Sequence, residues 1–196
     1  MSRNHGRSDD LRVQRTHKLI LDALLELTVQ KGFSAVTVSD ITQRAGINRA
    51  TFYRHYTDKF DVLDQYAQSI YELLDTVPPQ LSQPDAPGAD RMISGLVRIF
   101  DHIRDNATFY RVMLGRNGDP AFADQIRQYI QKRVRRSLLA GLPKDQVLID
   151  LYVAYSSSAS VGVVLWWLEN DLPYSSEELA GLLRRLEAGN LSALLQ

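Results

Sequence analysis

Two helix caps separated by a glycine turn restrict the fold of this 196-residue chain more than any other feature. Thr37 and Asp40 have the spacing of a capping box, in which each side chain accepts a hydrogen bond from the other residue's backbone amide. That helix is expected to end at Gly46, because glycine adopts the left-handed conformation of a C-cap without strain. Asn48 is then a good N-cap for a second short helix. Two capped helices joined by a glycine-containing turn predict a helix-turn-helix.

The second helix of this motif is expected to have two chemically different faces. Phe52 and Tyr56 are four residues apart, so they share the side that packs on Ile41 of the first helix. The opposite side carries a guanidinium, a methyl group and a phenol, from Arg49, Ala50 and Tyr53. These groups suit guanine, the methyl group of thymine and a phosphate, respectively. The motif therefore predicts contact with double-stranded DNA, with bases contacted by the N-terminal part of the helix and phosphates by its surroundings.

Helical rather than alternating periodicity extends over almost the whole chain. Apolar residues share one helix face in four further segments, Ile20 to Leu27, Leu63 to Leu74, Ile93 to Ile103 and Phe122 to Ile130. The first of these helices is expected to run from about Thr16 to Lys31, and the proline-rich segment 78–90 predicts a break or linker. The predicted fold is therefore all-α, with a small helical head that contains the helix-turn-helix, a hinge helix and a larger helical body at 91–196.

The segment 147–168 is apolar around much of its circumference. It is long enough to cross a bilayer, but Asp150 and a central run of serines favour a buried helix in a soluble assembly. Since one apolar stripe suffices to pack on its own subunit, we predict that a second stripe contacts a partner subunit. The helix from Ser175 to about Ala188 would complete a four-helix contact across a two-fold axis. The residues expected in that contact are Ala159, Gly162, Leu179 and Leu183; the alternative is a wholly internal core helix.

Composition narrows the possible functions. The chain has no cysteine, which excludes disulfides, thiolate metal sites and cysteine nucleophiles. It also lacks the Glu-x-x-His, His-Glu-x-x-His, P-loop and Gly-x-Gly-x-x-Gly motifs, so we expect no catalytic residue, metal or cofactor. The formal net charge is zero, but residues 1–60 carry ten basic and six acidic side chains. This excess of basic side chains favours an N-terminal domain, the head, that binds a polyanion. The polar N-terminus has no apolar signal region, which indicates an intracellular protein.

The segment GFSAVTVSDITQRAGINRATFYRHYTDKFDVL, residues 32–63, resembles the DNA-binding domain of the TetR family of bacterial transcriptional regulators. The similarity covers about residues 13–73, and its TFYRHYTDK core is highly specific. Asn48 stands where serine is commoner, and Phe60 stands where an acid often follows the lysine. The segments FYRVMLGRNGDPAF and LWWLENDLPYSSEELA are more loosely similar to one C-terminal domain type of the same family.

This resemblance implies a cytoplasmic homodimer on a palindromic operator, usually a repressor, with a ligand-binding C-terminal body. It also implies roles by position: Thr37 and Lys59 would contact phosphate, and Thr51 and His55 would touch the DNA backbone. The residues that would approach bases are Ser39, Arg49, Ala50 and Tyr53, with Asn48 at the shoulder of the helix. An N-terminal arm with Arg3, Arg7, Arg12 and Arg15 would either contact DNA or be a solvated tail.

Aromatic residues of the body are candidates for a pocket that binds a small, largely apolar effector. These residues are Phe109, Tyr110, Tyr152, Tyr155 and Trp166, each of which also suits an ordinary core. Two other functions fit an all-α chain, namely a protein-interaction module without a specific operator and a small helical enzyme. Operator footprinting separates both from a regulator, because neither predicts a protected palindrome.

Overall fold

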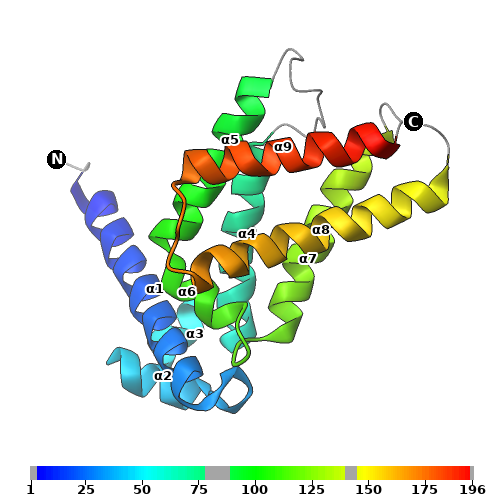
Figure 1. Cartoon of the computed structure of the whole chain (residues 1–196). Coiled ribbons are helices and arrows are strands. Elements are labelled where there is room, and N and C mark those ends of the chain that lie inside the picture. Colours follow the sequence, from blue (N-terminus) through cyan, green and yellow to red (C-terminus); the bar gives the residue numbers. More distant parts are fainter. Residues whose placement is uncertain (1–3, 78–88, 140–144, 195–196) are drawn as a thin grey trace.

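The computed structural model describes residues 4–77, 89–139 and 145–194, and within these ranges it contains nine α-helices, one 3-10 turn and no β-strand. The all-α prediction is confirmed. The helices are α1 (Asn4–Lys31), α2 (Val38–Ala45), α3 (Arg49–His55), α4 (Lys59–Asp75), α5 (Ala89–Asp105), α6 (Ala107–Met113), α7 (Pro120–Leu139), α8 (Gln146–Glu169) and α9 (Ser176–Leu194) (Figure 1). The 3-10 turn, Phe33–Ala35, lies between α1 and α2.

The first three helices form a small head around one apolar centre, which α4 joins to the body (Figure 1). Ile20 and Leu24 of α1, Ile41 of α2, Phe52 of α3 and Leu63 of α4 are all at most 2% exposed. The spacing of four residues between Ile20 and Leu24 places both on the side of α1 that faces α2 and α3. This core therefore fixes the orientation of the two helices of the helix-turn-helix.

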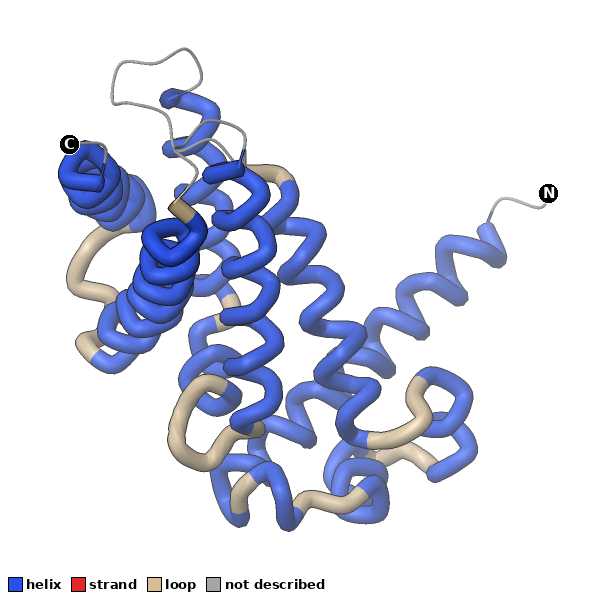
Figure 2. Tube along the Cα trace, turned by 90° about the vertical axis from the view of Figure 1, so that its right-hand side faces the viewer, coloured by secondary structure: helices blue, strands red, loops and turns tan. Residues whose placement is uncertain are grey.

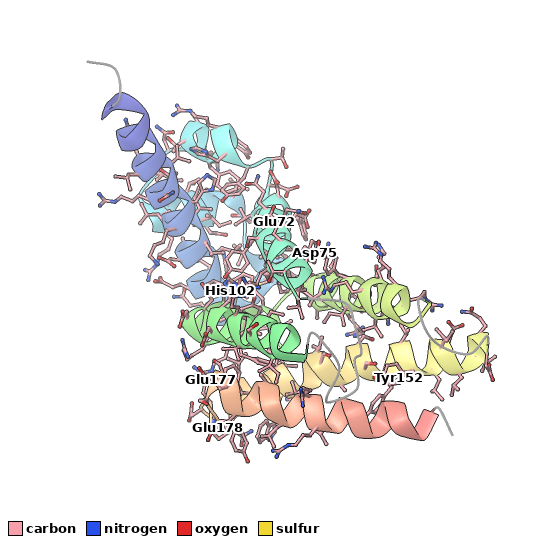
Figure 3. All side chains as sticks on the ribbon, turned by 90° about the horizontal axis from the view of Figure 1, so that it is seen from above. Glu72, Asp75, His102, Tyr152, Glu177 and Glu178 are labelled. Atoms are coloured by element: carbon pink, nitrogen blue, oxygen red, sulfur yellow. The ribbon has the colours of Figure 1, made fainter. Side chains whose placement is uncertain are left out.

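The body consists of α5 to α9, with α7 packed on α8 and α5 packed on α9. Figure 2 shows α8 and α9 as the outermost layer on one side of the molecule, with α4, α5 and α7 behind them. Trp167 is fully buried near the end of α8, where its indole nitrogen donates a hydrogen bond to the Tyr174 carbonyl at 2.9 Å. The Arg133 guanidinium of α7 pairs with the Asp75 carboxylate of α4 at 2.6 Å. Figure 3 labels Asp75 on α4.

The start predicted for the first helix is wrong, because α1 begins at Asn4 rather than near Thr16. Its N-terminal half projects away from the head (Figure 1), and the side chains from Leu11 to Arg15 are exposed. A helical segment that buries no face leaves no apolar periodicity in the sequence. Of the predicted arm, Arg12 and Arg15 therefore lie on an exposed helix, while Arg3 and the Arg7 side chain lie outside the described residues.

The linker predicted at 78–90 lies outside the described residues as far as residue 88, and its last two residues belong to α5. The domain boundaries therefore stay a prediction. The short helix α6 had no distinct signal in the sequence, because Ala107–Met113 continues the apolar pattern of α5 after a break at Asn106. Phe109, Tyr110 and Met113 of α6 are buried, and this short helix packs on α1 and α8. The Phe109 ring also contacts the Tyr66 ring of α4, with centroids 4.0 Å apart.

Candidate DNA-binding interface

The helix-turn-helix has the three caps that its sequence predicts. The Asp40 amide donates to Thr37 Oγ1 at 3.2 Å, and the Thr37 amide donates to Asp40 Oδ2 at 2.8 Å. The Lys31 ammonium, the Thr37 hydroxyl and the Thr37 amide all donate to the Asp40 carboxylate, and these bonds hold its pKa well below the usual range. Gly46 ends α2 in the left-handed conformation with φ 66°, and Asn48 Oδ1 accepts from the Thr51 amide at 2.7 Å. The capping box, the glycine C-cap and the asparagine N-cap are confirmed.

The two faces of α3 are also as predicted. Phe52 is fully buried and Tyr56 is 6% exposed, in the same core as Ile41. Arg49 and Tyr53 lie on the outer face, where the Tyr53 ring is 57% exposed. The other predicted DNA contacts with exposed side chains are Thr37, Ser39, Asn48 and Ala50, while Thr51 is half-buried. The structure thus presents an open outer surface on α3, although the individual DNA contacts stay predictions.

The Lys59 ammonium, predicted to contact phosphate, is hydrogen-bonded within the chain. Its ammonium donates to the carbonyls of Phe33, Ser34 and Val36 at 2.8, 3.0 and 2.8 Å. A lysine ammonium has three N–H donors, and in this structure all three are used within the chain, so the phosphate contact stays a prediction. Burial also lowers the pKa of Lys59. The geometry therefore assigns Lys59 a structural role, in which it caps the chain reversal between α1 and α2.

Lys59→Ala is therefore expected to destabilise the head rather than to weaken DNA binding directly. Removing the ammonium leaves three carbonyls without their donor, which should lower the free energy of unfolding by about 1–3 kcal/mol. Urea denaturation followed by circular dichroism measures this loss, with Lys18→Ala as the control because Lys18 is exposed. If Lys59→Ala leaves stability unchanged but weakens binding to all DNA sequences, the result would instead support the predicted phosphate contact.

His55, at the end of α3, contacts a histidine that the sequence did not single out. The His17 ring of α1 lies edge-on to His55, with ring centroids 4.9 Å apart, and His17 Nδ1 is hydrogen-bonded to the Tyr56 hydroxyl. Burial and the neighbouring His55 lower the pKa of His17. His17 and Tyr56 are 39 positions apart in the chain, so the local spacing of residues gave no signal of this contact. This contact ties α1 to the C-terminal end of α3.

The lowered pKa of His17 predicts a loss of stability in mild acid. An unfolded histidine titrates near pH 6.5, and the folded chain takes up this proton only at lower pH, so the unfolded state binds more protons in between. The contribution of His17 is thus fully present above about pH 6.5 and is lost as pH falls through the folded pKa. Unfolding free energies at several pH values should fall more steeply in the wild type than in His17→Gln. Parallel curves of unfolding free energy against pH for the two proteins would contradict this role of His17.

The residues predicted to bind an effector do not form one site. Tyr110 lines an apolar cavity of about 200 Å³ between α4, α5, α7 and α8, whereas Phe109 lines a separate cleft next to α1. Tyr152 is buried and lines neither space, and Tyr155 and Trp166 lie on the surface of α8, 54% and 45% exposed. The residues of the cavity that sequence reasoning missed include Leu96, Phe100, Ile126, Val164 and Leu183. The apolar periodicity of these residues predicted only that they lie in the core.

The two predicted dimer residues of α9 differ in exposure. Leu179 is 3% exposed in the core and so is not open to a partner subunit, whereas Leu183 is half-buried and lines the apolar cavity, so its place in a subunit contact stays a prediction. Gly162 is exposed and Ala159 is half-buried. A wholly internal α8 is also wrong, because Val147, Leu151, Tyr155 and Trp166 are between 45% and 77% exposed.

Two family models match the chain on either side of the linker segment. One, described as bacterial regulatory proteins of the tetR family, matches residues 20–66, and the other, a transcriptional regulator C-terminal region of the TetR type, matches residues 90–188. The chain belongs to the TetR family of transcriptional regulators. It therefore has a TetR-type helix-turn-helix for DNA and a TetR-type C-terminal domain, in a family that is not enzymatic.

Individual TetR-family relatives are similar mainly over the head. The chain is 36% identical over 85 residues to the uncharacterized HTH-type transcriptional regulator YdeS of Bacillus subtilis, which is 43% of this chain and 38% of that protein. It is 40% identical over 68 residues to YxbF of the same organism, which is 34% of this chain and 18% of that protein. The match thus spans less than two thirds of either relative. A TetR transcriptional regulator from Streptococcus agalactiae 2603V has the same fold, with a TM-score of 0.62 and 22% identity over 93% of this chain and 98% of that chain.

Proposed function

We propose that this TetR-family regulator is a cytoplasmic homodimeric repressor that binds a palindromic operator and is released by a small-molecule effector. The observation that carries the DNA-binding part is the outer face of α3. Its Arg49, Ala50 and Tyr53 side chains are exposed, while Phe52 and Tyr56 anchor the helix in the core beneath them. A rigid helix that projects a guanidinium, a methyl group and a phenol matches the chemistry of the major groove.

The surface of α8 supports a homodimer. Exposed Val147, Leu151, Tyr155 and Trp166 follow one side of this helix, and an apolar strip of this length is unusual on a monomer. Gly162 lies within the same strip, and a Cβ atom added to it would meet no heavy atom within 4 Å. The backbone there is open to a partner helix. We propose that two copies of α8 pair here across a two-fold axis.

By length and composition alone α8 would also suit a membrane, with 33% of its most apolar window buried. One such helix is weak evidence, because the core helices of soluble proteins pass the same test. Membership of a family of DNA-binding regulators and the flanking charged residues Asp145, Asp150 and Glu169 favour the contact between subunits. We therefore propose no membrane partner.

The apolar cavity supports the effector part of the proposal. Its wall combines residues of α4, which joins the head to the body, with residues of α8, where we place the dimer contact. A ligand in this cavity would thus touch both elements that set the distance between the two heads. It acts only through its different affinity for the two arrangements, and operator DNA must weaken its binding by the same factor. Calorimetry that shows equal ligand affinity with and without operator would contradict this coupling.

Selection from a pool of random duplex DNA tests the proposed function as a whole. The full chain should enrich a palindrome whose half-sites are related by a two-fold axis. Enrichment of no sequence above the starting pool would instead support a protein-interaction module. The comparison requires several salt concentrations, because non-specific binding through phosphates grows steeply as salt falls.

A further inference from the structure

The wall of the apolar cavity in the body defines the chemistry of the molecule that this cavity can take. Helices α4 to α9 each contribute to the wall. All but four of the described lining residues are isoleucine, leucine or valine, and the four exceptions are Phe100, Tyr110, Arg133 and Ser160. In other proteins, apolar cavities stay free of water and bind apolar molecules. The aliphatic wall therefore favours a hydrocarbon-like ligand.

The one charged side chain among these described lining residues already has its counter-ion. The Arg133 guanidinium donates to the Asp75 carboxylate at 2.6 Å and to the Val77 carbonyl at 2.5 Å. Hydrogen bonds from the Tyr129 hydroxyl and from Arg133 lower the pKa of Asp75, so this carboxylate is ionised at pH 7 and balances the guanidinium. An anionic ligand would have to displace Asp75, and a cationic ligand would meet no carboxylate in the described wall. Because a buried charge without a counter-ion is costly, a neutral ligand is favoured.

The two remaining polar groups of the described wall carry no charge. The Ser160 hydroxyl donates to the Ser156 carbonyl at 2.8 Å, so its hydrogen is used within α8. Burial raises the pKa of the Tyr110 phenol, so this group is protonated at pH 7. Neither group therefore supplies a binding partner for an ion.

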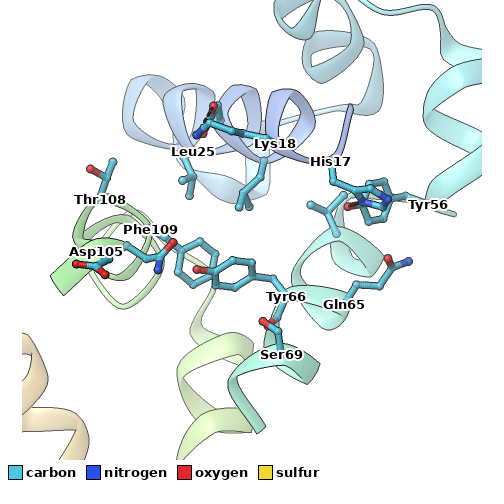
Figure 4. Close-up of a pocket in the computed structure, with 14 residues that line it drawn as sticks. His17, Lys18, Leu25, Tyr56, Gln65, Tyr66, Ser69, Asp105, Thr108 and Phe109 are labelled. Carbon is cyan, nitrogen blue, oxygen red and sulfur yellow. Dashed lines mark hydrogen bonds and ion pairs between the residues drawn. The ribbon is translucent and has the colours of Figure 1, made fainter. Parts of the chain in front are cut away.

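The cleft between α1, α4 and α6 has a different character, although it is larger, at about 650 Å³ (Figure 4). His17 and Lys18 of α1 line it, together with Asp105 at the end of α5. An apolar molecule in this cleft would cover polar and charged groups that water solvates better. Of these two spaces, the cavity in the body is the one that suits an uncharged apolar ligand.

The volume of the body cavity limits the size of its ligand. An engineered apolar cavity of about 150 Å³ in another protein binds benzene. In proportion, the 200 Å³ of this cavity hold a molecule of roughly eight to ten non-hydrogen atoms. We propose that the body cavity takes an uncharged hydrocarbon-like molecule of this size, such as an alkylbenzene, and excludes ions of the same shape.

This ligand class deepens the effector part of the proposed function. That the ligand controls operator binding rests on the proposed function, whereas its binding to the cavity does not. The test therefore uses the full chain without DNA. If no ligand of this class binds, the operator-binding proposal is unaffected. If no operator is found, binding of the ligand can still be measured.

Isopropylbenzene, benzoate and benzamidinium form a matched set of probes, because all three have the same number of non-hydrogen atoms and nearly the same shape. The first is uncharged, whereas benzoate is an anion and benzamidinium a cation at pH 7. In titrations followed by NMR, we expect isopropylbenzene to bind at least about tenfold more tightly than either ion, because the ions lose their hydration without gaining a counter-ion. Its binding should shift the methyl signals of Ile126 and Val164 in the wall more than that of Ile20 in the head.

Two substitutions that fill the cavity from different helices test the location of the site. Val134→Phe on α7 and Val164→Phe on α8 each add a ring to the wall. Both should weaken isopropylbenzene binding at least about tenfold, because a close-packed interior leaves no room for ring and ligand together. Lys132→Phe is the control, since it adds the same ring to an exposed position of α7. Circular dichroism shows which variants are folded, and the methyl shifts of the wild type locate the site independently of them.

Four results would overturn the proposal. The first is the absence of isopropylbenzene binding by the wild type. The second is binding of benzoate or benzamidinium as tight as that of isopropylbenzene, because the wall would then compensate a charge. The third is a set of methyl shifts confined to residues outside the cavity. The last is a folded Val134→Phe or Val164→Phe protein that binds isopropylbenzene as tightly as the wild type does.

Discussion

Arg49→Ala is expected to abolish sequence-specific DNA binding while leaving the fold intact. Arg49 is exposed on the outer face of α3, so its side chain contributes little to the core. A bidentate contact to a base contributes about 1–3 kcal/mol of discrimination, and a two-fold dimer makes each contact twice. Operator binding should therefore weaken by about 2–6 kcal/mol, which is roughly 30-fold to 10⁴-fold.

Titrations on operator and random DNA distinguish this role from a purely electrostatic one. Arg49→Ala should lose affinity for the operator and retain most of its affinity for random DNA. Arg127→Ala is the matched control, because Arg127 is paired with Asp124 on α7, in the body. Equal losses on the two DNAs would show that Arg49 contacts phosphate and does not select bases.

Gly162→Arg is expected to give a folded monomer with collapsed operator binding. Gly162 is exposed on α8, and its Cβ position meets no neighbour within 4 Å, so the subunit itself should tolerate the substitution. An arginine is also a better helix former than glycine by about 1 kcal/mol. In a symmetric dimer, however, two guanidinium groups would enter the same close contact. Since tethering two heads raises avidity by about 10²–10⁴, the monomer should lose that factor on the operator.

Sedimentation, circular dichroism and operator titration of the same samples measure these effects separately. Gln128→Arg adds the same charge to an exposed position of α7 and should remain a dimer that binds operator normally. A wild-type protein that is monomeric at micromolar concentration would contradict the α8 contact. So would a monomeric Gly162→Arg protein that binds operator at full strength.

The head was predictable where its structure is set by neighbouring residues. Thr37, Gly46 and Asn48 act on backbone groups within a few positions of themselves, so their types and spacing suffice. Lys59 shows the limit of this reasoning. Its three carbonyl partners lie 23 to 26 residues earlier in the chain, and only the packing of α4 against the 3-10 turn brings them together. A lysine that contacts DNA and a lysine that donates to backbone carbonyls are the same residue type, so the sequence alone does not distinguish the two roles.

The body shows a different limit. Apolar periodicity located α8 and α9 and gave α8 two apolar stripes, but it does not say which residues contact their own subunit. Leu179 packs in the core, whereas Tyr155 and Trp166, predicted as ligand residues, lie on the surface that we propose for the dimer. Contacts within a subunit and contacts between subunits both use apolar side chains. Which residues of α8 and α9 contact their own subunit depends on where α7 and α5 pack against them, and the sequence does not give these positions.

Hydroxyl-radical footprinting of a selected operator, with the mass of the complex measured on the same sample, tests the central claim most directly. We expect two chains per operator and two protected half-sites in symmetric positions, with centres one helical turn, about 34–36 Å, or a multiple of it apart. Arg49→Ala should erase this pattern at concentrations where the wild type protects it. A complex with one chain per site, or protection without two-fold symmetry, would contradict a homodimer that recognises a palindrome through α3.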